Sequence, residues 1–246
     1  MHRSMASSKA DIIAQLQKDI LPLQGFKAPL NNAIMDTVPG PIKNAFPNAL
    51  FPLGAVHEFI YAGAEDAAAT GGFVAAILAT LMRNSGASIW ISSSRLIFPP
   101  ALKTFDIVPD KIIFIDLQKE EEIPWAMEEA LKCNGLSAVI GEIRELSFTA
   151  SRRLQLAVEQ SRVTGFILRR NPRNLNTTAC LARWKITPLP SELPGDMPGV
   201  GFPRWNVELL KVRNGKPANW QLEFVAGRFR HIAKITVIHQ QQKKAV

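Results

Sequence analysis

Gly63-Ala64-Glu65-Asp66-Ala67-Ala68-Ala69-Thr70 is the stretch from which the fold can be worked out. Laid over the phosphate-binding consensus G-x-x-x-x-G-K-[ST], Gly63 supplies the first glycine and Thr70 the metal-binding hydroxyl. Ala68 stands in place of the second glycine, and Ala69 in place of the lysine that reaches the β- and γ-phosphates. Two acidic residues inside the stretch would repel phosphate. We therefore predict a degenerate P-loop without ATPase activity and without a cofactor.

The flanks of the stretch have the context of a P-loop. Residues 55–61 are predicted to form a buried strand before it, and residues 70–84 a helix after it. The strand, loop and helix are kept while the catalytic residues are lost, and this combination favours a binding protein that has the fold of an ATPase. The alternative is a common strand–loop–helix without P-loop ancestry, because eight residues with two key positions changed are not a motif match.

The chain continues as alternating strands and helices. Apolar runs without alternation are found at residues 88–92, 111–116, 137–141 and 166–168, and predicted helices lie between them at 99–106, 124–133 and 149–162. This pattern predicts an α/β fold with a mostly parallel central sheet covered by helices on both faces.

After residue 180 the pattern changes to antiparallel strands. Residues 205–212 and 219–224 alternate between apolar and polar side chains, and the Asn214-Gly215 pair between them predicts a hairpin. A further run over 229–238 is expected to extend the sheet.

The ends of the chain differ from this core. We divide the chain into an N-terminal helix (1–25), a Pro-rich linker (26–52), an α/β domain (53–238) and a disordered tail (239–246). Residues 8–21 place five large aliphatic side chains on one helical face, namely Ile12, Ile13, Leu16, Ile20 and Leu21. This face needs a surface to pack on, either in its own domain or in a neighbouring copy by self-association.

Composition indicates a cytoplasmic protein without a membrane segment. No apolar run reaches the roughly 18–20 residues of a membrane helix, and the N-terminus has no apolar signal core. The two cysteines, Cys133 and Cys180, are expected to be buried free thiols. No Cys or His spacing predicts a metal site.

The net charge of +8 is unevenly distributed. Residues 1–143 contain 11 Lys/Arg and 15 Asp/Glu, whereas residues 144–246 contain 18 and 6. The basic half indicates either a polyanion or acidic protein partner, or a solvated surface with no specific partner.

The order of the elements resembles the RecA core, in which a P-loop strand and helix precede parallel βα units and late antiparallel strands. Within about residues 50–226 the chain more closely resembles the ImuA family of inducible-mutagenesis proteins. The most specific strings are Trp125-Ala126-Met127-Glu128-Glu129-Ala130-Leu131-Lys132-Cys133 and Thr149-Ala150-Ser151-Arg152-Arg153-Leu154-Gln155-Leu156-Ala157.

This resemblance implies a non-catalytic accessory factor of SOS-induced mutagenic translesion DNA synthesis. The implied partners are an ImuB-type relative of the Y-family polymerases, an error-prone C-family DNA polymerase, and RecA. Two other hypotheses remain open at this point, a cell-division inhibitor of the SulA type and an active RecA-like ATPase.

RecA-like folds also suggest where further site residues lie. The fourth strand of a P-loop ATPase ends in a magnesium-binding acid, and here either Glu142 fills that position or Gly141 does and the acid is lost.

The loops after the fourth and fifth strands are the candidate surface for DNA or a partner. We expect Arg169, Arg170 and Arg173 to bind there from a loop after the fifth strand, through salt-sensitive phosphate contacts. Arg152 and Arg153 are weaker candidates, because ordinary exposed helix residues would have the same pattern.

Overall fold

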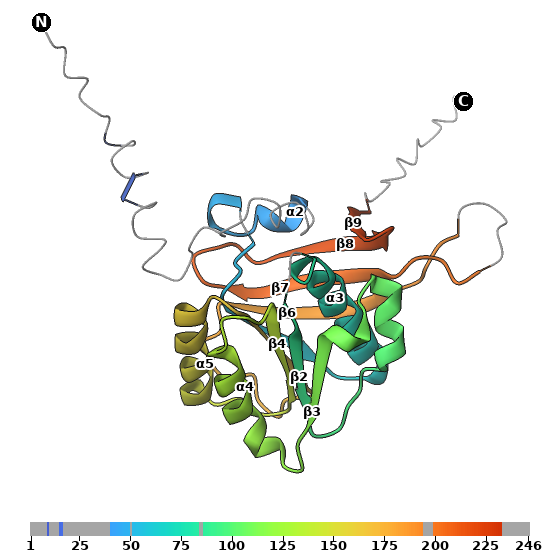
Figure 1. Ribbon diagram of the computed structural model, residues 1–246. Helices are drawn as coiled ribbons and strands as arrows, with labels where there is room; N and C mark the ends of the chain where they lie inside the picture. The colour runs from blue at the N-terminus through green and yellow to red at the C-terminus, as the bar shows by residue number, and fades with distance from the viewer. Residues whose placement is uncertain are drawn as a thin grey trace, which may run out of the picture.

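A single nine-stranded sheet organises the molecule in the order β3-β2-β4-β5-β1-β6-β7-β8-β9 (Figure 1). The structure is a computed structural model that describes residues 9, 15, 16, 40–49, 51–83, 86–193 and 199–232. Most of the expected N-terminal helix and the whole expected C-terminal tail lie outside the described residues.

The strands are β1 (Val56–Tyr61), β2 (Ser88–Ser92), β3 (Ile112–Asp116), β4 (Ala138–Ile143), β5 (Thr164–Arg170), β6 (Ala182–Leu189), β7 (Arg204–Val212), β8 (Ala218–Val225) and β9 (Arg228–His231). The α-helices are α2 (Gly40–Lys43), α3 (Ala64–Leu81), α4 (Ile123–Leu131) and α5 (Phe148–Ser161). Short 3-10 helices are η2 (Pro47–Ala49), η3 (Pro99–Phe105), η4 (Pro109–Lys111) and η5 (Glu120–Glu122).

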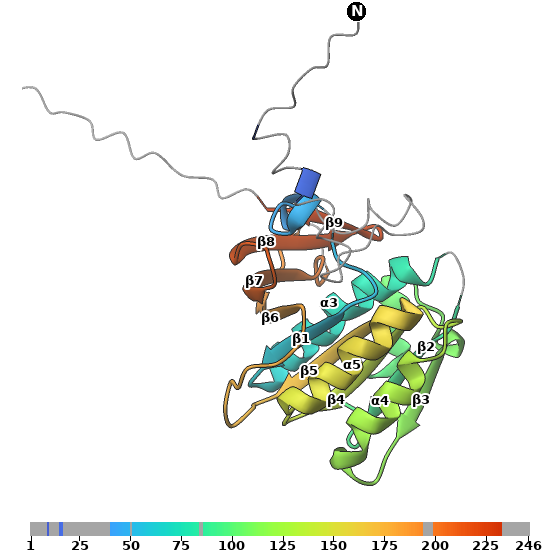
Figure 2. The ribbon, with the colours of Figure 1, turned by 90° about the vertical axis from the view of Figure 1, so that its left-hand side faces the viewer.

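The six strands from β3 to β6 are parallel, and β1 lies between β5 and β6. One face packs on α3 and the other on α4 and α5, so that two separate apolar cores form (Figure 2). Parallel strands covered on both faces are apolar throughout, which explains the runs without alternation. The predicted α/β fold class is confirmed, and the arrangement is that of a RecA-like fold.

The antiparallel end of the sheet is also confirmed. Strands β6 to β9 pair antiparallel, and the turn after β7 contains Asn214 at a φ of 56°. The run expected over 229–238 begins as β9, and its remainder lies outside the described residues.

The end of the expected linker differs from a simple connector. Its residues 40–49 contain α2 and η2, and Ile42, Phe46 and Phe51 are buried. The Phe46 and Phe51 rings lie 5.9 and 6.1 Å from the ring of Trp184. Packing of these aromatic and aliphatic residues therefore extends the folded unit back to about residue 40.

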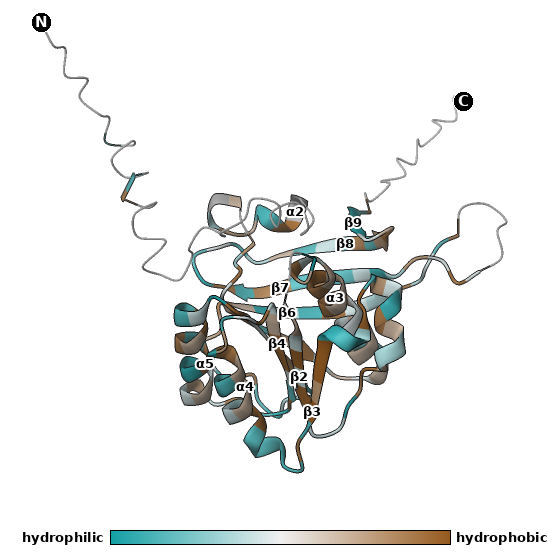
Figure 3. Cartoon of the chain, in the orientation of Figure 1, coloured by the Kyte–Doolittle hydropathy of each residue, from teal (hydrophilic) through white to brown (hydrophobic). Residues whose placement is uncertain are grey.

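The larger core is rich in aromatic side chains around α3. Phe73 packs edge-on against Trp205 with ring centroids 5.7 Å apart. A Cβ at Gly72 would lie 3.2 Å from the Phe105 ring, so the glycine lets η3 approach the helix closely. By length and composition alone, α3 could cross a membrane, but 61% of its 18 residues are buried inside the protein. Figure 3 shows the apolar strands at the centre of the molecule and polar residues on the outer surfaces of α4 and α5.

Candidate functional site at the carboxyl edge of the sheet

The stretch predicted as a degenerate P-loop is helical. α3 begins at Ala64, six residues before the expected helix, and Gly63 is its N-cap residue with an extended backbone. The Ala67 N–H donates to the Gly63 carbonyl at 3.0 Å. Alanine has the highest helix propensity, and acidic residues in the first turn favour the helix dipole. Because of these preferences, the stretch forms a helix and not the wide loop that would surround a phosphate.

The predicted P-loop residues lie on α3, and their side chains do not have the positions that they would have in a phosphate-binding loop. Ala68 is exposed on the surface of α3, whereas Ala69 is buried. Thr70 is completely buried, and its hydroxyl has no hydrogen-bond partner among the described residues. Thr70 therefore does not present its hydroxyl at the edge of the sheet, where a working P-loop would bind a metal ion.

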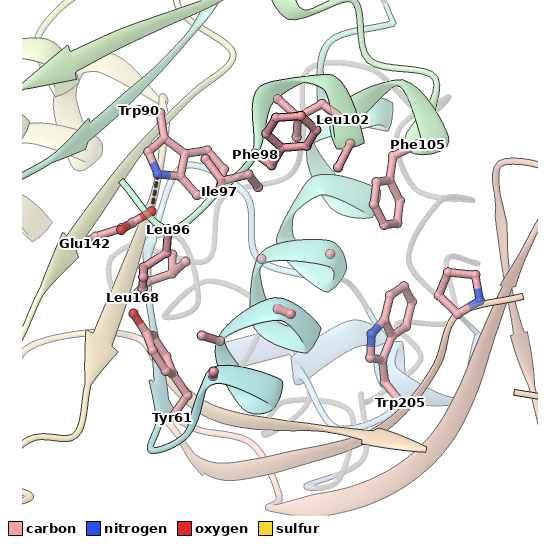
Figure 4. A pocket seen from close by; sticks show the side chains of 17 residues that line it. Tyr61, Trp90, Leu96, Ile97, Phe98, Leu102, Phe105, Glu142, Leu168 and Trp205 are labelled. Carbon is pink, nitrogen blue, oxygen red and sulfur yellow. Dashed lines mark hydrogen bonds between the residues drawn. The ribbon is translucent and has the colours of Figure 1, made fainter. Parts of the chain in front are cut away.

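An apolar cavity of about 480 Å³ lies beside the first turns of α3. Aromatic and aliphatic side chains surround α3, whose own side chains here are too short to fill the space (Figure 4). They come from regions that are distant in sequence, with Tyr61 at the end of β1, Trp90 in β2, Leu96 to Phe105 after β2, Leu168 in β5, and Trp205 in β7. A cavity of this composition suits apolar groups better than a triphosphate.

Glu142 lies inside β4 and borders this cavity. Its Oε1 accepts a hydrogen bond from the Trp90 Nε1–H at 2.6 Å, as Figure 4 shows. Burial raises the pKa of the Glu142 carboxyl, while hydrogen bonds from Trp90 and from the Leu96 backbone N–H act in the opposite direction. The carboxyl thus connects β2, β4 and the segment that forms one side of the cavity. Of the described residues, no three His, Cys, Asp or Glu are placed to hold a metal ion.

Arg169 is the main correction among the predicted binding residues. β5 continues to Arg170, so Arg169 lies in a strand and its side chain is completely buried. Its Nη1–H donates to Glu58 Oε1 at 2.6 Å and its Nε–H to the Arg144 carbonyl at 3.2 Å. A guanidinium held in this way cannot contact a DNA phosphate.

Glu58 is the centre of this buried ion cluster. Its second oxygen accepts from Arg183 Nε at 2.8 Å and from the Thr178 hydroxyl at 2.9 Å. The Asn176 side-chain oxygen accepts a hydrogen bond from Arg169 Nη1 at 3.2 Å, and the Asn176 backbone carbonyl accepts one from Arg183 Nη2 at 2.7 Å. The cluster therefore fixes the connection between β5 and β6 against the face of the sheet. The sequence signal for such a cluster was Glu58 itself, because a charged residue within a buried strand needs an oppositely charged partner.

The other predicted arginines are exposed, as binding would require. Arg170 ends β5, and Arg173 follows in the connection, where its backbone N–H donates to Glu145 Oε1 at 2.9 Å. Arg152 and Arg153 lie on α5, and Arg153 forms an ion pair with Glu128 at 2.6 Å. The structure thus separates Arg170 and Arg173 at the carboxyl edge from two arginines on a helix surface.

The two cysteines differ from each other. Cys180 is buried, and burial raises the pKa of its thiol to about 12. Cys133 is exposed, so its expected burial was wrong. Both are free thiols.

The fold and the carboxyl edge together define a RecA-like α/β protein in which a helix occupies the place of the phosphate-binding loop. No family model matches the chain.

Two relatives, each named Protein ImuA, come from two strains of Caulobacter vibrioides. Each is 36% identical to this chain over 194 residues, which is 74% of this chain and 80% of the relative. The chain therefore belongs to the ImuA family, and this membership connects it with the mutagenic response to DNA damage.

Proposed function

We propose that this protein is a non-catalytic accessory factor of mutagenic translesion DNA synthesis. It acts in the cytoplasm by binding an ImuB-type relative of the Y-family polymerases, an error-prone C-family polymerase and RecA. The observation that carries the proposal is the replacement of the phosphate-binding loop by the first turns of α3.

The chemistry at this edge supports a role without ATP hydrolysis. The lysine position holds the buried Ala69, and Glu65 and Asp66 carry negative charge in the first turn of α3. The adjacent cavity is apolar and would not compensate the charge of a triphosphate. Nucleotide binding would require α3 to unwind over two turns and to expose its buried residues.

Arg170 and Arg173 are the surface cations that we assign to partner binding. Both are exposed at the carboxyl edge, and the buried Glu58–Arg169 pair fixes the strand and connection that carry them. A rigid position lowers the entropic cost of binding for these long side chains. Their charge suits an acidic protein surface, and DNA is the second candidate because the same charge attracts phosphates.

The first test measures nucleotide binding by calorimetry on the full chain. We expect no heat of binding up to millimolar ATP with magnesium, with an intact RecA-like ATPase as the positive control. Saturable ATP binding would overturn the non-catalytic proposal.

The second test is a pull-down with each of the three proposed partners. The wild-type chain should capture the ImuB-type protein, and Arg170→Glu with Arg173→Glu should weaken capture. Lys103→Glu with Lys111→Glu makes the same charge change at two other exposed cations and should have no effect. Capture of none of the three partners by the wild-type chain counts against the function itself.

A further inference from the structure

The apolar cavity beside α3 continues into a second one. This second cavity, of about 640 Å³, is lined by residues 188–191 and 200–205, and it shares Ala68, Pro203 and Trp205 with the first. We call the two together the α3 groove. Each volume is within the range of about 300–1,000 Å³ that is common for binding pockets.

The rim of the α3 groove exposes large apolar side chains. Leu96 is 48% exposed and Phe98 is 68% exposed along the first cavity. Val200 is 90% exposed and Phe202 is 41% exposed along the second. Single exposed apolar residues are ordinary, but several around one groove indicate a surface that another element covers.

The floor of the α3 groove suits a helix. Where α3 borders the first cavity, its residues are small, namely Ala64, Ala67, Ala68, Gly71 and Gly72, and at the second cavity Glu65 joins Ala68 and Ala69. Side-chain size at the contact sets the distance between two packed helices, so a second helix can approach α3 closely. Apolar anchors on one face of that helix would then enter the two cavities.

The chain itself contains a segment with this pattern. Residues 8–21 place Ile13, Leu16 and Ile20 at helical spacing on one face. The structure describes Leu16 of this segment in a helical conformation with 54% of its surface exposed. Among the residues that the structure describes, both this apolar anchor and the rim of the α3 groove therefore remain largely exposed.

We propose that the α3 groove of one copy receives residues 8–21 of a second copy. The second copy is the occupant, because Leu16 is 54% exposed and is not buried in its own core. Residues 22–39 join the segment to the described core, and that length of chain extends to about 60 Å, enough to reach a neighbour. A reciprocal exchange buries both grooves in a closed two-fold dimer. This contact is independent of the proposed function, since it needs neither DNA nor a repair partner.

Sedimentation velocity of the full chain across a wide range of concentrations tests the contact. The wild-type chain should form a dimer. Leu16→Asp damages the segment and Ala68→Arg blocks the groove, and each should weaken the dimer by roughly tenfold or more, as for loss of an interface anchor. Gln17→Asp beside the anchor and Gln160→Arg at the end of α5 are matched controls that should behave as wild type.

Mixing the two defective variants gives the sharpest result. The Leu16→Asp chain keeps its groove and the Ala68→Arg chain keeps its segment, so a mixed pair retains one intact contact. The mixture should therefore associate more strongly than either variant alone. A mixture no stronger than its components, or a wild-type chain that stays monomeric at every concentration, would overturn the proposal.

A peptide of residues 8–21 provides a measurement that does not depend on dimer formation. Added to the Leu16→Asp chain, it should change the fluorescence of Trp90 and Trp205, which line the groove. The same peptide should leave the Leu16→Asp, Ala68→Arg double variant unchanged. Circular dichroism checks that this variant is folded, and equal responses from the two chains would also contradict the proposal.

Discussion

His57 and Glu58 are adjacent in β1 and both are completely buried, on opposite faces of the sheet. The His57 ring stacks on Phe51 at 4.8 Å, and its Nε2–H donates to the Pro52 carbonyl at 2.7 Å. Its Nδ1 accepts from the Trp184 Nε1–H at 3.3 Å, and because that indole group only donates, Nδ1 carries no proton. These contacts keep the ring neutral. Burial lowers the pKa of His57 from 6.5 to about 4.

The neutral His57 predicts a loss of stability in acid. Above pH 6.5 the ring is neutral in both states, and as the pH falls toward 4 only the unfolded chain takes up the proton. The free energy of unfolding should therefore fall by about 3 kcal/mol from this group between pH 6.5 and 4. Urea denaturation of wild type and His57→Gln measures it, since the difference between them should shrink by that amount. His231→Gln, at an exposed position, is the control and should follow the wild-type curve.

Removing the charge of Glu58 should strongly lower the stability of the protein. Glu58→Gln leaves the buried guanidiniums of Arg169 and Arg183 without their shared counter-charge. Removing one partner of a buried ion pair typically costs about 3–5 kcal/mol, and we expect a loss of this size in urea denaturation. Glu129→Gln removes an exposed pair with Lys132 and should change little. Similar stabilities for both variants would show that the cluster is not a major contributor.

At the scale of elements, α3 determines what the carboxyl edge can bind. The helix needs only Ala62 and Gly63 between itself and β1, so no loop is left to surround a phosphate. Its small residues leave the α3 groove open on the surface, while Gly72 admits the Phe105 and Trp205 rings from the side.

This arrangement predicts that restoring the consensus residues does not restore the site. Ala68→Gly with Ala69→Lys recreates the glycine and lysine, but the lysine would start from a buried position on a helix. We expect no ATP binding by calorimetry and a loss of several kcal/mol in stability from the buried charge. Glu65→Lys, at an exposed position of the same helix, should keep its stability. ATP binding by the double variant would show that the stretch can still adopt a P-loop.

The elements also show which parts of the structure the sequence could predict. Apolar runs identify β1, β2 and β4, and Asn214-Gly215 identifies the β7–β8 turn, because these signals are local. The consensus alignment misplaced the start of α3, although Ala67-Ala68-Ala69 after two acids was a helix signal in itself. The α3 groove could not be predicted, since its lining combines residues within 61–72, 90–105, 188–191 and 200–205 with Glu142 and Leu168. Arg169 was misjudged because its partner Glu58 lies 111 positions away.

At the scale of the whole molecule, the charge difference between the two halves of the sequence becomes a difference between the two ends of the sheet. β3 with Asp116 lies at one edge, close to Asp110 in η4 and to the acidic η5, and β9 with Arg228 and Arg230 lies at the other. Arg170 and Arg173 lie between them at the carboxyl edge. A polyanion would therefore be drawn away from the β3 end of the molecule.

Salt-titrated DNA binding tests this distribution. If Arg170 and Arg173 each contact a phosphate, changing both to Glu should reduce the slope of log affinity against log salt by about 0.9 per lost contact. The Lys103→Glu, Lys111→Glu control, near the acidic end, should keep the wild-type slope. An unchanged slope in the Arg170 and Arg173 variant would exclude DNA at this edge and leave the partner interpretation.

The position of β1 between β5 and β6 also has a kinetic consequence. Its buried Glu58 binds Arg169 and Arg183, which lie 111 and 125 positions later in the chain. During synthesis β1 emerges long before either arginine, and burying it early would leave an uncompensated charge. Contacts at such separation slow folding, because the chain between them must be ordered first. The central strand of the sheet is thus among the first to leave the ribosome and among the last to be completed.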